Sequence, residues 1–111
     1  MADFPPLPRK VSGIIGPIAV SVVVEVDQSE ESATVHDART FGEWFPVERR
    51  IRIRKSLAPI LQWHTLYHEQ CHAWLDDTGA RYGIPEDLEE RICEAVALGR
   101  LREMQEKMRQ G

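Results

Sequence analysis

A His-Glu-x-x-His pattern at residues 68–72 restricts the fold of this chain more than any other feature of its sequence. On an α-helix, residues four apart lie on one face about one turn from each other, so His68 and His72 can both reach a single ion. Zinc accepts neutral imidazole nitrogens, and a catalytic zinc site normally adds one further protein ligand and a water. The pattern therefore predicts a helix that carries half of a metal site, with Glu69 beside it. The alternative is a surface helix on which these side chains meet by chance.

A third ligand has to come from elsewhere, and the candidates within the stretch 86–109 are Glu89, Glu90 and Glu94. Acidic residues at the start of this stretch and basic residues at its end complement a helix dipole, so we expect a helix here. Glu90 and Glu94 are four apart, and such a like-charge pair is unfavourable unless a cation lies near it. We expect Glu90 to be the third ligand. We expect Glu94 to accept the free N–H of a ligand histidine, and His68 is the first candidate for that histidine. Glu89 is the alternative ligand, and two solvent-facing glutamates are the alternative without a metal.

The residues before the pattern predict a small sheet, which makes the fold class α+β. β-branched runs and period-two alternation place strands at 18–26, 33–36 and 50–54, with a loop at 40–46. In the third of these strands Ile51 and Ile53 point inward and the arginines point outward. That row of arginines is either a solvated face or a patch for an acidic partner.

Helix signals and prolines set the remaining boundaries. Ser56 is a candidate N-cap and Pro59 suits a first turn, so the pattern predicts a helix from residue 57 to residue 76. Three prolines near the N-terminus predict an extended tail, because proline fixes φ and removes a backbone donor. We therefore expect a Pro-rich tail at 1–12 and a single domain at 13–111.

Composition excludes several classes of protein. A chain of 111 residues suffices for one compact domain, and its net charge of −4 disfavours nucleic-acid binding. The longest apolar run, 14–24, is interrupted and too short to span a bilayer, and the N-terminus lacks the order of a secretory signal. Two cysteines, Cys71 and Cys93, are too few for a disulfide framework. We expect a cytoplasmic protein with reduced thiols and no membrane or nucleic-acid partner.

The two motifs together, His68-Glu69-x-x-His72 and Glu90-x-x-Cys93-Glu94, resemble those of the gluzincin metallopeptidases, and most closely those of small ImmA/IrrE-like and phage-type zincin domains. The resemblance covers roughly residues 47–100. It implies a zincin-like fold, in which a small antiparallel or mixed sheet of about three strands packs on an active-site helix and a C-terminal helix. It also implies one zinc ion per chain, and a sheet-edge strand that binds a peptide substrate by β-augmentation, with the outward residues Arg50, Arg52 and Arg54.

The predicted site implies peptide hydrolysis. Zinc held by His68, His72 and Glu90 would lower the pKa of a bound water, while Glu69 would take the proton of that water and pass it to the leaving amine. The developing oxyanion needs a further donor, for which the sequence offers four candidates: Tyr67, Tyr82, His64 and His36. The alternative is a non-catalytic, zinc-stabilised module that binds a protein partner. In either case the partner is a peptide or a protein.

Overall fold

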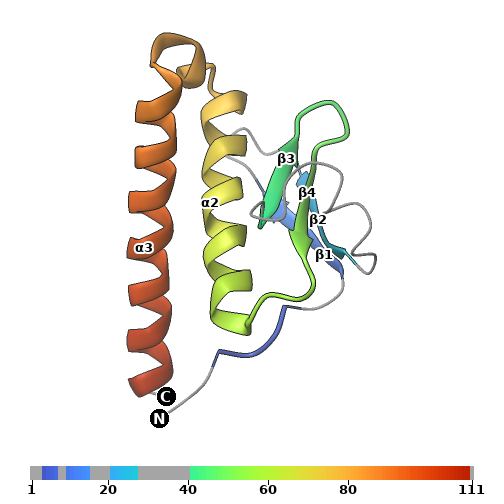
Figure 1. Ribbon diagram of the computed structural model, residues 1–111, viewed down its shortest axis with the longest axis vertical. Helices are drawn as coiled ribbons and strands as arrows, with labels where there is room; N and C mark the ends of the chain where they lie inside the picture. Colours follow the sequence, from blue (N-terminus) through green and yellow to red (C-terminus); the bar gives the residue numbers. More distant parts are fainter. Residues whose placement is uncertain (1–3, 8–9, 16–20, 28–40, 111) are drawn as a thin grey trace.

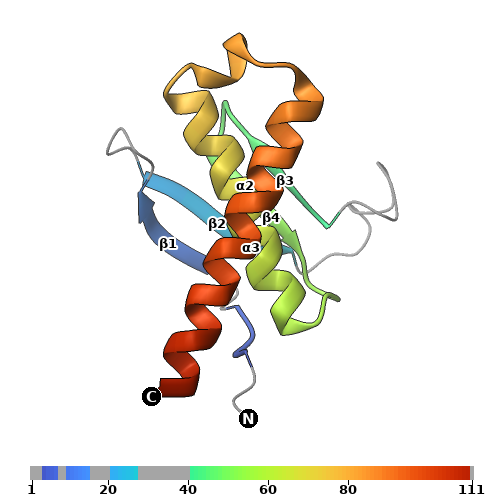
Figure 2. The same ribbon diagram turned by 90° about the vertical axis from the view of Figure 1, so that its left-hand side faces the viewer.

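The computed structural model describes residues 4–7, 10–15, 21–27 and 41–110, and these residues form a small α+β fold. In chain order the elements are β1 (Lys10–Ile15), β2 (Ser21–Asp27), β3 (Gly42–Phe45), β4 (Arg50–Arg54), α2 (Pro59–Asp77), the short 3-10 helix η1 (Ala80–Gly83) and α3 (Glu86–Gln110). The layers follow the order sheet, α2, α3, so that α2 lies between the sheet and α3 (Figure 1). Figure 2, turned by 90°, shows α3 running across α2. The predicted α+β class is confirmed, but α3 packs on α2 and not on the sheet.

The sheet of the described residues is mixed, with the strand order β1-β2-β4-β3. Strands β2 and β4 are parallel, whereas β1 pairs with β2, and β3 with β4, in antiparallel fashion. Strand β4 was expected to be the edge that binds substrate through Arg50, Arg52 and Arg54, and this prediction is wrong because β2 and β3 flank it. The alternating side chains of β4 indicate that one face of the strand is buried. They do not indicate which strands pair with the β4 backbone.

Two strands of the sheet have no counterpart in the sequence predictions. Strand β3 lies in the stretch 40–46, which was expected to be a loop, and β1 begins inside the expected tail. Strand β3 has four residues between Gly42 and Phe45, and its pairing with β4 stabilises it where its own sequence pattern is weak. The strand expected at 33–36 lies outside the described residues.

The core lies between the sheet and α2. Ile51 and Ile53 of β4 are fully buried, as their alternation predicted, and they pack with Trp44 of β3 and Leu66 of α2. Leu7 is buried in the same cluster. Its backbone N–H donates to Gln62 Oε1 at 2.9 Å, so the described part of the Pro-rich segment, 4–7, is bound to α2.

Both predicted helices are present. Helix α3 spans Glu86–Gln110, with acidic residues in its first turn and basic residues in its last, as predicted. Helix α2 has Pro59 in its first turn, but its N-cap is Ala58, which provides no side-chain hydrogen bond, so the expected Ser56 cap is wrong. The reason is a backbone turn at this point, in which Leu57 N–H donates to Arg54 C=O and delays the helix. Neither helix combines the length and apolar character that a membrane crossing requires.

Candidate metal centre

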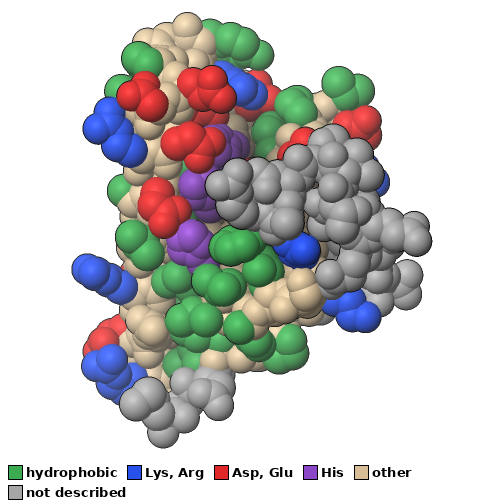
Figure 3. All heavy atoms as spheres, viewed as in Figure 1, with side chains coloured by type: hydrophobic (Ala, Val, Ile, Leu, Met, Phe, Trp, Pro, Cys, Tyr) green, Lys and Arg blue, Asp and Glu red, His purple; other side chains and the backbone are tan. Residues whose placement is uncertain are grey.

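The His-Glu-x-x-His pattern lies on α2, on the face next to α3. One side of α2 is buried against the sheet, which leaves His68 and His72 at the boundary between the two helices, with 16% and 13% of their side chains exposed. In Figure 3 the histidine side chains form a column on the surface, with carboxylates along one side of it. His68, Glu69 and His72 offer ligand atoms that all lie within 4.8 Å of one another, so this group could hold a metal ion.

Glu90 of α3 faces both histidines through its two carboxylate oxygens. Its Oε2 lies 3.1 Å from His68 Nε2 and its Oε1 lies 3.0 Å from His72 Nε2. Half of the Glu90 side chain is exposed, so it reaches the histidines from the rim of the site. The structure therefore places the residue expected as third ligand against the same nitrogen of each ring.

The other nitrogen of each ring faces a second carboxylate from α3. His68 Nδ1 lies 3.0 Å from Glu94 Oε1, and His72 Nδ1 lies 2.6 Å from Glu89 Oε2. An ionised carboxylate only accepts hydrogen bonds, so a neutral ring that donates Nδ1–H to its carboxylate has a lone pair on Nε2. The Glu94 partner was expected. The role of Glu89 at His72 was not, since sequence reasoning offered Glu89 only as an alternative ligand.

These contacts give a test of whether a cation fits. Two Nε2 lone pairs and two Glu90 oxygens converge, and none of these four atoms supplies a proton to another while both rings are neutral. A positive charge, from a bound cation or from protonation of the rings, makes the arrangement favourable. Ligands at about 2.0–2.1 Å from a tetrahedral zinc ion lie roughly 3.3 Å from each other, close to the distances observed here. The donor set fits a divalent cation.

Glu69 lies where the sheet meets α2. Burial is the main cause that raises the pKa of Glu69 to about 7; the charge of His68 and a hydrogen bond from the Trp44 backbone N–H oppose this shift. Gly42 of β3 makes the close approach possible, since a Cβ there would lie 2.5 Å from Thr65 Cγ2 and 3.5 Å from Glu69 Cγ. The edge strand thus lies directly against the carboxylate expected to act as general base.

A cleft of about 440 Å³ opens over these groups. It is lined by residues of α2, of α3 and of the start of β3: Phe41, Gly42, His64, Thr65, His68, Glu69, Glu90 and Glu94. One wall is therefore strand edge, and the opposite wall carries carboxylates.

The candidate oxyanion donors lie in different places. His64 lines the cleft. Tyr67 does not, because its hydroxyl donates to Met104 Sδ at 3.6 Å and its ring packs under Arg100. Tyr82 is 80% exposed, and its hydroxyl donates to Asp76 Oδ1 at 3.3 Å. His36 lies outside the described residues.

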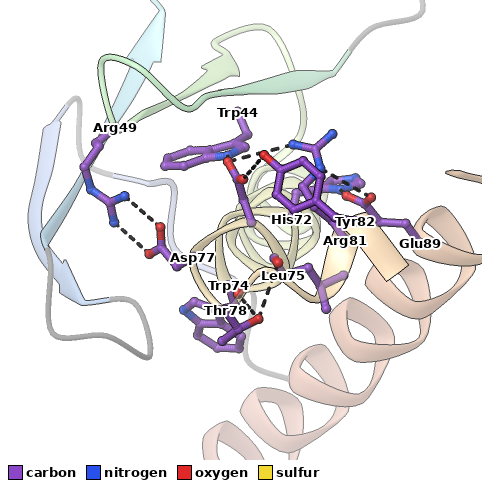
Figure 4. A network of polar contacts seen from close by, with 11 residues as sticks. Trp44, Arg49, His72, Trp74, Leu75, Asp77, Thr78, Arg81, Tyr82 and Glu89 are labelled. Carbon is purple, nitrogen blue, oxygen red and sulfur yellow. Dashed lines mark hydrogen bonds and ion pairs between the residues drawn. The ribbon is translucent and has the colours of Figure 1, made fainter. Parts of the chain in front are cut away.

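A polar network continues from His72 toward the end of α2 (Figure 4). Glu89, which holds the His72 ring, lies 3.8 Å from Arg81 of η1. Farther along, Asp77 accepts two hydrogen bonds from Arg49, at 2.7 and 2.8 Å. The Arg49–Asp77 contact holds the β3–β4 turn to the end of α2, and the Arg81–Glu89 contact holds η1 to the start of α3.

Two free cysteines lie at the interface between α2 and α3. Cys71 and Cys93 are buried, and each lies between two of the site residues in sequence. The hydrogen bond between the two thiols, together with burial, raises the pKa of Cys93. Both side chains are small and allow the two helices to approach closely.

Among the described residues, the histidines and carboxylates that converge at this site all come from α2 and α3. Comparison of the chain with known protein families, with curated proteins and with solved structures finds no match. The function therefore has to be inferred from the side chains and their geometry.

Proposed function

We propose that this protein is a small zinc-dependent metallopeptidase with a zincin-like site, which resembles that of the gluzincins. Its metal ligands are His68, His72 and Glu90, and its general base is Glu69. The observation that carries the proposal is the convergence of the Nε2 atoms of two histidines on the two oxygens of one carboxylate, next to a further, partly buried carboxylate in an open cleft. Imidazole and carboxylate ligands in this ratio suit zinc, and three protein ligands leave a position for water.

The residues of the site would divide the reaction between them. When bound, a zinc ion supplies a Lewis acid that polarises a carbonyl group and makes water more acidic. Glu69 takes a proton from the attacking water and delivers it to the leaving amine. Glu94 and Glu89 keep the Nδ1 protons of the two ligand histidines in place, so that both Nε2 atoms stay available.

The cleft suggests how a substrate approaches. Among the strands of the described residues, β3 pairs with β4 alone, and the cleft is lined by Phe41, just before β3, and by Gly42, its first residue. An extended peptide that pairs with β3 would therefore run past Glu69. A peptide or protein substrate follows from this placement, and the edge strand in the proposal is β3.

A second candidate function is a zinc-stabilised module without catalysis. The positions of the ligands on two different helices favour it, because a metal ion held by His68 and Glu90 would connect α2 to α3. Small domains gain much of their stability from such a link. The presence of Glu69 in the cleft favours the peptidase, since a structural site has no use for a base.

Elemental analysis and a peptide digest of the same samples test the proposal. The wild-type protein should contain about one zinc ion per chain and should cleave members of a random peptide library, with the products identified by mass spectrometry. Glu69→Gln should keep its zinc and lose turnover, whereas Glu90→Ala should lose much of its zinc. Zinc in both the wild type and Glu69→Gln, with no cleavage by either, would favour the structural module. Cleavage by Glu69→Gln at the wild-type rate would reject the assigned base.

A further inference from the structure

His64 is the third histidine on the cleft face of α2, one turn before His68. It lines the cleft, and 20% of its side chain is exposed. Its Nε2 lies 3.0 Å from Glu94 Oε2, while the other oxygen of that carboxylate, Oε1, lies 3.0 Å from His68 Nδ1. A single carboxylate from α3 therefore joins the two histidines.

This contact fixes what His64 can donate. The Glu94 carboxylate only accepts, so the proton of a neutral His64 ring lies on Nε2, and Nδ1 is left with a lone pair. A ring in this tautomer has no second N–H for an oxyanion in the cleft. The geometry thus points away from the role of transition-state donor that the sequence suggested for His64.

Glu94 depends on a second hydrogen bond more than Glu89 does. Its side chain is 46% exposed, whereas the side chain of Glu89, which holds His72, is 7% exposed. Burial alone restricts the rotamers of Glu89, but Glu94 could turn toward water if His68 were its sole partner. The hydrogen bond from His64 removes that freedom, because it holds the second oxygen of Glu94 in place.

We propose that His64 is a positioning residue, which fixes Glu94 by donating Nε2–H to Oε2 and thereby keeps the His68 Nε2 lone pair directed at the metal. The inference rests on the metal ligands of the proposed function, and it does not depend on peptide hydrolysis. It assigns to His64 an effect on metal affinity through Glu94, without direct contact between His64 and the ion.

Zinc affinity, measured by competition with a chromophoric chelator at pH 7.5, tests this inference without an activity assay. His64→Leu removes the donor and should weaken zinc binding about tenfold, at the low end of the loss that follows when a hydrogen-bond partner of a metal ligand is removed. His64→Gln offers an amide N–H2 that can reach the same oxygen, and it should stay within about threefold of the wild type. Leu61→Ala, one turn earlier on the same helix, is the matched control and should not change the affinity. Circular dichroism of the metal-free proteins checks their fold, and His64→Asn, too short to reach Glu94, replaces His64→Leu if that variant does not fold.

A double-mutant cycle shows whether the effect passes through Glu94. In a Glu94→Ala background, His64→Leu should cost no further affinity. Unchanged zinc affinity in His64→Leu would overturn the inference, and so would a loss in His64→Gln as large as that in His64→Leu. It would also be overturned if His64→Leu lowered zinc affinity equally in the wild type and in the Glu94→Ala variant. A wild-type protein that takes up no zinc rejects the proposed metal site as well, whereas normal zinc uptake with an insensitive His64→Leu rejects the role of His64 alone.

Discussion

His72 Nδ1 and Glu89 Oε2 lie 2.6 Å apart, the shortest of the contacts that hold the ligand histidines, and both side chains are largely buried. The carboxylate comes from the first turn of α3, which is also where negative charge is most favourable along a helix. Glu89 therefore supports the proposed metal site from inside the helix interface.

Removal of this support should weaken metal binding. Glu89→Ala leaves His72 Nδ1 without its acceptor, so the ring loses its fixed tautomer and orientation, and zinc affinity should fall about 10- to 100-fold in chelator competition. Glu86→Ala removes an exposed acidic residue from the same turn and serves as the control. Equal affinity in Glu89→Ala and the wild type would show that the contact has no influence on the metal.

Two glycine substitutions should change stability in opposite directions. Gly42→Ala places a Cβ 2.9 Å from the Arg52 carbonyl oxygen and 2.5 Å from Thr65 Cγ2, so β3 has to move away from α2, at a cost of about 1–3 kcal/mol in the free energy of unfolding. Gly99→Ala meets nothing within 4 Å on α3 and should stabilise the protein by about 0.5–1 kcal/mol. Urea denaturation measures both. Because β3 contacts Glu69, Gly42→Ala should also reduce any peptide cleavage, and Gly99→Ala should leave it unchanged.

The ion pair between Arg49 and Asp77 should make stability depend on pH. The hydrogen bonds from Arg49 lower the pKa of Asp77, so this contribution to stability is fully present above the unfolded pKa of about 4 and is lost as the pH falls through the lower, folded value. Asp77→Asn should therefore lower the free energy of unfolding by about 1 kcal/mol at pH 7, and the difference should disappear in strong acid. Asp87→Asn removes a carboxylate that is 80% exposed and 3.8 Å from Arg91, and it should show almost no effect at either pH. A deficit of Asp77→Asn that persists unchanged at pH 2 would contradict this assignment.

Metal removal should lower the melting temperature. A ligand that binds only the folded state stabilises it by about 4 kcal/mol at a free concentration a thousand times its Kd, so zinc should raise the melting temperature and a chelator should reverse the rise. Glu90→Ala should show a much smaller response, because it lacks the carboxylate that faces both histidines. The check is differential scanning calorimetry with and without zinc. An identical response in Glu90→Ala would place the ion elsewhere on the chain.

The sequence predicted those elements whose periodicity is strong. The alternation of Ile51 and Ile53 and the charge order of α3 identified β4 and the last helix with nearly their observed bounds. Strand β3 was missed because four residues that begin with Gly42 show no period, and their pairing with β4 is a tertiary effect.

Regular spacing along a helix also made part of the candidate site predictable. The spacing of His68 and His72 follows from helix geometry, and the structure places Glu90 and Glu94 beside them. The partner of His72 could not be read from the sequence, because it depends on how α3 is rotated against α2. One signal was present: Glu89 is the first member of the row Glu89, Cys93, Ala97 and Leu101, four apart each time, which forms the buried face of α3. A glutamate in an otherwise apolar row requires a polar partner inside the interface.

The proposed ligands and their supporting carboxylates all lie on one contiguous helical hairpin, between residues 64 and 94, whereas the sheet contacts the site at Glu69. The ligands and the general base would then be encoded by the hairpin, and the strand that guides a substrate past Glu69 by a separate part of the chain. A helical hairpin of this kind could exchange its sheet for another during evolution and keep its ion, and the approach of a strand to Glu69 would decide whether the new combination is an enzyme.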